Sequence, residues 1–99
     1  MAYNLITSPE AEFDIERAVK WYVNINIELA QQFIIELKAA KIYIVNNPKK
    51  IQIRYNKTRI AFLKRFPYGI HYVFHKKTIV IVAVFNTAEN PIKWKKRSR

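Results

Sequence analysis

Apolar residues recur every three to four positions through the first half of the chain. The repeat runs over residues 9–23 and resumes over residues 26–46, which is the spacing of two amphipathic helices. Ser8 with Pro9 is typical of a helix start, and Asn26 can cap the second helix. Asn47-Pro48 ends that helix, because Asn tolerates a left-handed turn and Pro cannot continue a helix. The short connection predicts an antiparallel hairpin.

The rest of the chain has a period of two, which is typical of strands. The expected strands are residues 3–7, 59–66, 69–75 and 78–85. Residues 50–54 are expected to form an irregular extended piece. Short turns at 67–69 and 75–78 predict an antiparallel meander for the last three strands. The pattern therefore predicts an α+β fold: a strand, a helical hairpin and a three-stranded antiparallel meander, with the helices packed on one face of a small sheet.

The last strand, residues 78–85, is apolar on both faces, so we expect it to lie inside the sheet with both of its faces covered. The helices can cover one of its faces. The C-terminal tail or another protein is then needed to cover part of the other face.

Length and composition favour one globular domain. The chain has 99 residues, of which 51% are hydrophobic, so residues 1–99 are expected to form one domain with a basic tail from about residue 90. No apolar run reaches the roughly 18 to 20 residues of a membrane span, and the N-terminus lacks a secretion signal, which predicts a cytoplasmic protein. With no cysteine, two histidines and one glycine, we expect no disulfide, metal site or cofactor.

The charge changes sign along the sequence. Residues 1–36 hold six acidic and two basic residues, a net charge of −4, whereas residues 37–99 hold 16 basic residues and Glu89, a net charge of +15. Such a positive field attracts polyanions or acidic proteins.

Basic and aromatic residues alternate in the second half, a pattern that suits nucleic acid or an acidic protein groove. The basic members are Arg59, Lys64, Arg65, Lys76, Lys77, Lys93, Lys95, Lys96, Arg97 and Arg99, beside Phe66, Tyr68, Tyr72 and Trp94. Binding is favoured for Arg59, Arg65 and the tail. Strand alternation instead predicts that Phe66, Tyr72 and Phe74 belong to the core.

Few residues are candidates for catalysis. His71 and His75 share one face of the strand 69–75, but about 13 Å of strand separates them, so they cannot bind one metal ion. A lone strand histidine is more often a packed or surface residue than a general base. The acidic residues at positions 10, 12, 14 and 16 lie near a helix N-terminus, where the helix dipole favours them, so a solvated helix face explains them.

Short motifs in a characteristic order cover nearly the whole chain. They are Ser8-Pro9-Glu10-Ala11-Glu12-Phe13-Asp14-Ile15, Trp21-Tyr22, Ala30, Phe33, Asn47-Pro48, Arg59, Leu63-Lys64-Arg65-Phe66-Pro67-Tyr68-Gly69-Ile70-His71-Tyr72, Ile81-Val82-Ala83-Val84, Asn90-Pro91 and Trp94. Together they resemble the RelE/ParE superfamily of toxins from type II toxin-antitoxin, or plasmid stabilisation, systems. The turn Phe66-Pro67-Tyr68 between two strands is the most specific piece. The fold that the resemblance implies agrees with the pattern described above.

The resemblance implies one of two activities. RelE-like toxins cut messenger RNA on the ribosome with cationic residues on the meander strands and an arginine and an aromatic hydroxyl after the last strand. The positions that match here carry Ile60, Phe62, Gly69, Ala88, Glu89 and Trp94. Apolar replacements remove contacts to the transition state. The chain is closer to the ParE-like branch, which lacks the cutting set and acts by binding DNA gyrase, although relatives there often carry His and Arg at the positions of Asn86 and Glu89.

The resemblance also implies a cognate antitoxin whose acidic, partly disordered segment folds over the toxin. We expect it to bind the helical hairpin and the exposed sheet edge, in a dimer or a heteromeric toxin-antitoxin complex. The residues expected to contact the target are Arg59, Lys64, Arg65, Lys93, Trp94 and Arg97.

Two alternatives stay open. One is a metal-independent, ribosome-dependent endoribonuclease that uses Arg59, Arg65 and His71. The other is a degenerate, nontoxic relative that still binds an antitoxin.

Overall fold

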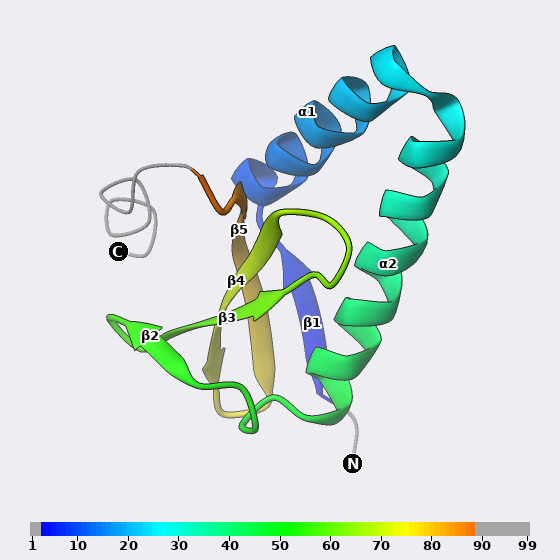
Figure 1. Ribbon diagram of the computed structural model, residues 1–99. Helices are drawn as coiled ribbons and strands as arrows, with labels where there is room; N and C mark the ends of the chain where they lie inside the picture. Colours follow the sequence, from blue (N-terminus) through cyan, green and yellow to red (C-terminus); the bar gives the residue numbers. More distant parts are fainter. Residues whose placement is uncertain (1–2, 89–99) are drawn as a thin grey trace.

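A helical hairpin lies on one face of a five-stranded sheet in the computed structural model, which describes residues 3–88 (Figure 1). The elements are β1 (Asn4–Thr7), α1 (Pro9–Ile25), α2 (Ile27–Asn46), β2 (Ile53–Tyr55), β3 (Thr58–Phe62), β4 (Tyr68–His75) and β5 (Thr78–Asn86). The strand order is β1-β5-β4-β3-β2, with β1 parallel to β5 and every other pair antiparallel. The predicted α+β architecture is confirmed, and the irregular piece contributes β2 as a fifth strand.

Both helix starts form as the sequence predicts. The Ser8 hydroxyl accepts the N–H of Ala11 at 3.1 Å, and Asn26 Oδ1 accepts the N–H of Glu28 at 2.8 Å. Asn26 alone links the helices, because it ends α1 and caps α2. At the other end of α2 the helix ends before Pro48 as predicted, but Asn47 does not adopt a left-handed conformation, since its φ is −141°.

The strand predicted at 59–66 ends at Phe62, four residues early. The backbone N–H groups of Lys64 and Arg65 donate to the Glu36 carboxylate of α2 instead of to a strand. The N–H of Leu63 donates to Tyr68 O at 2.9 Å, which joins the two ends of this segment. Residues 63–67 therefore form a loop, called here the β3–β4 loop, which is fastened to α2.

The core between helices and sheet centres on aromatic rings. Tyr22, Phe33 and Phe66 have ring centroids 5.1 to 5.4 Å apart, so both helices and the β3–β4 loop meet at one cluster. The predicted core positions Phe66 and Tyr72 are buried. Ile25, the last residue of α1, is 58% exposed, because the end of the hairpin extends beyond the sheet (Figure 1).

Residues 47–52, called here the α2–β2 connection, cross the end of the sheet. The Tyr72 hydroxyl donates to Pro48 O at 2.8 Å. Arg59 Nη1 donates to Lys49 O at 3.2 Å and to Ile51 O at 2.6 Å. Two side chains of the sheet thus hold this connection by its backbone carbonyls.

The predicted internal position of the last strand is confirmed, since β5 lies between β1 and β4. β1 pairs with β5 only as far as Ile81. Further along β5, Asp14 of α1 provides a hydrogen-bond acceptor, since its Oδ2 accepts the N–H of Val84 at 3.1 Å. Asp14 is therefore buried and bonded to the sheet, which corrects the expectation that all acids of α1 are solvated. Within residues 3–88, neither helix is long and apolar enough to cross a membrane.

Tyr72 offers a test of the α2–β2 connection. Burial raises its pKa to about 12; Arg59 opposes this shift and Tyr43 adds to it. A raised pKa means that the folded state retains the proton, so this contribution to stability is present below the ordinary value near 10 and is lost as pH rises from about 10 to 12. We expect Tyr72→Phe to lower the free energy of unfolding by about 1 kcal/mol at neutral pH and to flatten the alkaline loss.

Urea unfolding at neutral and alkaline pH measures both effects. Tyr43→Phe is the matched control for the loss at neutral pH, because Tyr43 is 49% exposed. Equal losses in the two variants would contradict the role given to Tyr72.

Candidate functional site

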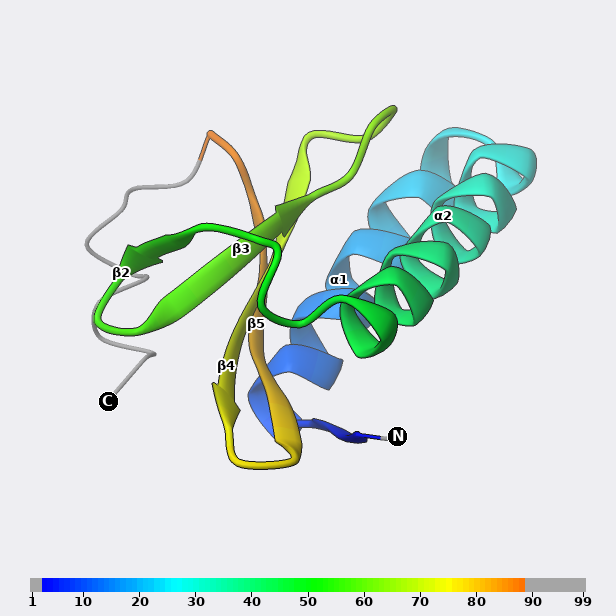
Figure 2. The same ribbon diagram turned by 90° about the horizontal axis from the view of Figure 1, so that it is seen from below.

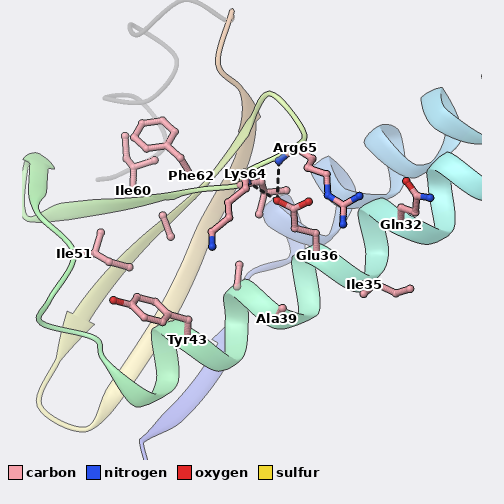
Figure 3. A pocket seen from close by; sticks show the side chains of 13 residues that line it. Gln32, Ile35, Glu36, Ala39, Tyr43, Ile51, Ile60, Phe62, Lys64 and Arg65 are labelled. Atoms are coloured by element: carbon pink, nitrogen blue, oxygen red, sulfur yellow. Dashed lines mark hydrogen bonds between the residues drawn. The ribbon is translucent and has the colours of Figure 1, made fainter.

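A groove of about 820 Å³ runs between α2 and β3 (Figure 3). It is lined by Gln32, Ile35, Glu36, Ala39, Ala40, Tyr43, Ile51, Ile60, Ala61, Phe62, Leu63, Lys64 and Arg65. The lining residues of α2 lie three or four positions apart and so occupy one helix face. We call this feature the α2–β3 groove.

The α2–β3 groove exposes large apolar side chains. Ile35 is 67% exposed, Tyr43 is 49% exposed and Phe62 of β3 is 47% exposed, whereas Ile60 beside it is buried. Exposed apolar side chains that line a groove are candidates for an interaction site.

The outer edge of β3 also faces the α2–β3 groove. β2 pairs with β3 only at Thr58 and Arg59. From Ile60 to Phe62, no described strand pairs with this edge. An edge with free backbone groups can accept a further strand from another chain.

Two cations close one end of the α2–β3 groove. Glu36 Oε2 accepts the N–H of Lys64 and, at 3.0 Å, that of Arg65. The backbone of the β3–β4 loop is fixed by these bonds while both cationic side chains stay exposed. Figure 3 shows Lys64 reaching over the groove and Arg65 turned towards Gln32. Glu36 was not predicted as a site residue, although its spacing from Gln32 and Tyr43 places it on the same helix face.

The structure separates the predicted target-contact residues. Lys64 and Arg65 lie together at the α2–β3 groove, but Arg59 is partly buried and donates to the carbonyls of the α2–β2 connection. Its guanidinium therefore has a structural role. The other three predicted contact residues, Lys93, Trp94 and Arg97, lie outside the described residues.

The alternative catalytic set does not converge. Arg59 pairs with Tyr72 and Ile60 pairs with His71, so Arg59 and His71 point to opposite faces of the sheet. His71 is 1% exposed, and the Tyr55 hydroxyl lies 2.7 Å from its Nδ1. Arg65 lies in the β3–β4 loop. A reacting group could not touch all three side chains at once.

An apolar cluster occupies the sheet face opposite the helices. Gly69 pairs with Phe62 and with Phe85. A Cβ atom at Gly69 would lie 2.7 Å from Ile60 Cγ2 and 3.3 Å from Phe62 Cδ1, so the neighbouring side chains fill the space above this glycine. Arg54 Cζ lies 5.4 Å from the centroid of the Phe62 ring. Three of the positions that match the RelE-like cutting residues, Ile60, Phe62 and Gly69, thus lie together and carry no cation of their own, whereas Glu89 and Trp94 lie outside the described residues.

Metal ligands do not gather in residues 3–88, where no three His, Asp or Glu side chains are placed to hold an ion.

Comparisons with known proteins agree with this geometry. The family model described as the ParE toxin of the type II toxin-antitoxin system parDE matches residues 5–91. A solved structure of the chromosomal ParDE toxin-antitoxin system from P. aeruginosa superposes with a TM-score of 0.75 at 19% sequence identity, covering 85% of this chain and 95% of the other. No curated protein matches the chain. Because the family model spans most of the sequence, the chain belongs to the ParE toxin family of type II toxin-antitoxin systems.

Proposed function

We propose that this toxin acts in the cytoplasm as a single domain by binding and poisoning DNA gyrase, without chemistry of its own, and that its antitoxin neutralises it by placing an acidic segment in the α2–β3 groove. The observation that carries the target proposal is that Ile60, Phe62 and Gly69 hold three positions where a RelE-like toxin is expected to carry cations, with the space above Gly69 filled by its two neighbours. Arg59 and His71 on opposite sheet faces support it further.

The antitoxin proposal rests on three features of the α2–β3 groove. Ile35, Tyr43 and Phe62 offer exposed apolar area, and fully burying a side chain of this size contributes about 1.5 to 3 kcal/mol. The open edge of β3 offers backbone groups to an extended segment. Lys64 and Arg65 supply positive charge at one end. A segment that is both apolar and acidic satisfies all three.

Target contact is assigned to the exposed cations of the β3–β4 loop, Lys64 and Arg65, together with Lys93, Trp94 and Arg97 of the tail. Arginine and tryptophan are the residue types that most often dominate a protein interface. Because Lys64 and Arg65 also line the α2–β3 groove, an antitoxin seated there would cover them, which gives neutralisation by occlusion.

Two isoleucines of α2 test the antitoxin site. Ile35 and Ile42 are 67% and 63% exposed, but only Ile35 lines the α2–β3 groove. We expect Ile35→Ala to weaken antitoxin binding about tenfold or more, since it removes an anchor of about 1.4 kcal/mol or more. Calorimetric titration with the purified antitoxin measures this. Ile42→Ala should bind like the wild type, and equal weakening by both changes would place the antitoxin elsewhere.

A double variant tests the target proposal. We expect Lys64→Gln with Arg65→Gln to reduce gyrase-dependent DNA breakage at least tenfold, because two charge-assisted contacts are lost. Arg17→Gln with Lys20→Gln removes the same residue types from exposed positions of α1 and should leave breakage unchanged. DNA cleavage by purified gyrase is the readout.

Primer extension on translating ribosomes, run in parallel, covers the alternatives. New cleavage ends in messenger RNA would replace the gyrase proposal by an endoribonuclease. Normal growth during expression without antitoxin would replace it by a nontoxic relative.

Glu36 should position these cations. Glu36→Ala leaves the N–H groups of Lys64 and Arg65 without their acceptor, so we expect hydrogen exchange at these two amides to accelerate at least tenfold and gyrase-dependent breakage to fall. Glu36→Gln retains one carbonyl acceptor and should restore part of both. Gln32→Ala, in the wall of the same groove, is the control. Unchanged exchange in Glu36→Ala would contradict the positioning role.

A further inference from the structure

Two pairs of adjacent lysines, far apart in sequence, lie at the same end of the sheet. Lys49 and Lys50 belong to the α2–β2 connection, and Lys76 and Lys77 form the turn between β4 and β5. Both segments face the viewer in Figure 2, which looks at this end of the molecule. Lys49 Nζ lies 5.8 Å from the ring centroid of Phe74, near the end of β4, so the first pair reaches towards the second. We call these four residues the lysine end.

No carboxylate compensates the lysine end within the described part of the chain. The six acidic residues between positions 3 and 88 all lie on the two helices. Two of them are already bonded at other places, Asp14 to Val84 and Glu36 to the β3–β4 loop. Folding therefore brings four like charges together against their mutual repulsion.

The backbone beneath the lysine end is fixed. Lys49 O accepts from Arg59, and Pro48 O accepts from Tyr72. Lys77 O accepts the N–H of Asn4 at 2.9 Å. The four ammonium groups thus project from two ordered segments, and the charge of Arg59 lies below them.

The turn between β4 and β5 holds a lysine where the backbone favours another residue. Lys76 has a φ of 56°, in the left-handed region. Glycine or asparagine occupies such hairpin positions at lower steric cost. Lys57, with a φ of 66° in the turn between β2 and β3, meets the same cost, so two hairpin turns of the sheet carry a lysine in the left-handed region.

The chemistry of the lysine end fits nucleic acid better than an acidic protein segment. An acidic segment that folds on binding needs apolar surface to bury, yet neither residues 47–52 nor the turn 75–78 exposes a large apolar side chain. The phosphates of duplex DNA require only fixed positive charges, because release of counterions supplies the binding free energy.

We propose that the lysine end binds the phosphate backbone of duplex DNA, independently of base sequence and through residues that do not themselves line the α2–β3 groove. This inference does not depend on gyrase being the target. It adds DNA as a direct partner of the toxin chain itself.

Salt-dependent binding tests the proposal. The purified full chain is titrated against a fluorescent duplex of about 20 base pairs at salt concentrations from about 50 to 200 mM. Each neutralised phosphate contributes about 0.9 to the slope of log affinity against log salt. We expect Lys49→Gln with Lys50→Gln, or Lys76→Gln with Lys77→Gln, to reduce the magnitude of the slope by about 2, and the fourfold variant to reduce it by 3 to 4. The wild-type affinity should then fall about 100-fold more over this salt range than that of the fourfold variant.

Lys20→Gln with Lys38→Gln is the control, because it removes two exposed lysines from the helices and leaves the tail unchanged. Its slope should stay near the wild-type value. Retained antitoxin binding verifies that each variant is folded, and the two separate pairs give independent measurements if the fourfold variant is not. The proposal is overturned if the fourfold variant keeps the wild-type slope, or if the control pair lowers it as much as either lysine pair. Lysine-dependent binding of a polyglutamate peptide without binding of DNA would likewise overturn it and identify an acidic protein as the partner.

Discussion

The hydrogen bonds from the sheet to the α2–β2 connection fix most of what is functional in this molecule. Tyr72 and Arg59 are cross-strand neighbours on β4 and β3, and both donate to backbone carbonyls of that connection. The connection is therefore held across the end of the sheet, and β2 pairs with only two residues of β3. The remaining edge of β3 stays open beside α2, which creates the groove. Without these bonds the backbone of Lys49 and the open edge of β3 would lose their common support, whereas the turn of Lys76 and Lys77 is held separately by the bond from Asn4 to Lys77 O.

The sequence allowed the elements and the fold class to be predicted because each depends on local patterns. Ser8, Asn26 and the helical repeat of apolar residues mark the two helices, and alternation marks the meander. The early end of β3 could not be seen in this way. It depends on Glu36, which lies 28 residues from Lys64 in sequence, and no local pattern reports which helix side chain will meet which loop amide.

The candidate site was predicted only in part for the same reason. Exposed cations at Lys64 and Arg65 follow from composition and turn signals. The inward role of Arg59 does not, because its acceptors belong to a connection without regular structure. Asp14 is a similar case: a helix-start carboxylate looks solvated in sequence, yet it replaces a missing strand partner on β5. Both predictions failed because the hydrogen-bond partner belongs to another element of the fold.

The two faces of the sheet have different physical characters. The helix side carries the aromatic core and, at its border, the open groove with its exposed isoleucine and tyrosine. The other face holds the cluster of Ile60, Phe62 and Phe85 around a glycine, with a buried histidine beside it. The first face borders the groove proposed for the antitoxin, whereas on the second face Ile60 and Phe62 fill the space above Gly69, although Phe62 is itself 47% exposed. That filled space has a consequence for evolution. A long cationic residue at position 69 would need Ile60 and Phe62 to shrink beforehand, and each such step loosens hydrophobic packing before any selectable advantage appears. A change of Gly69 to a cationic residue would therefore have to cross a fitness valley, which keeps this position closed to charge in any lineage with this arrangement.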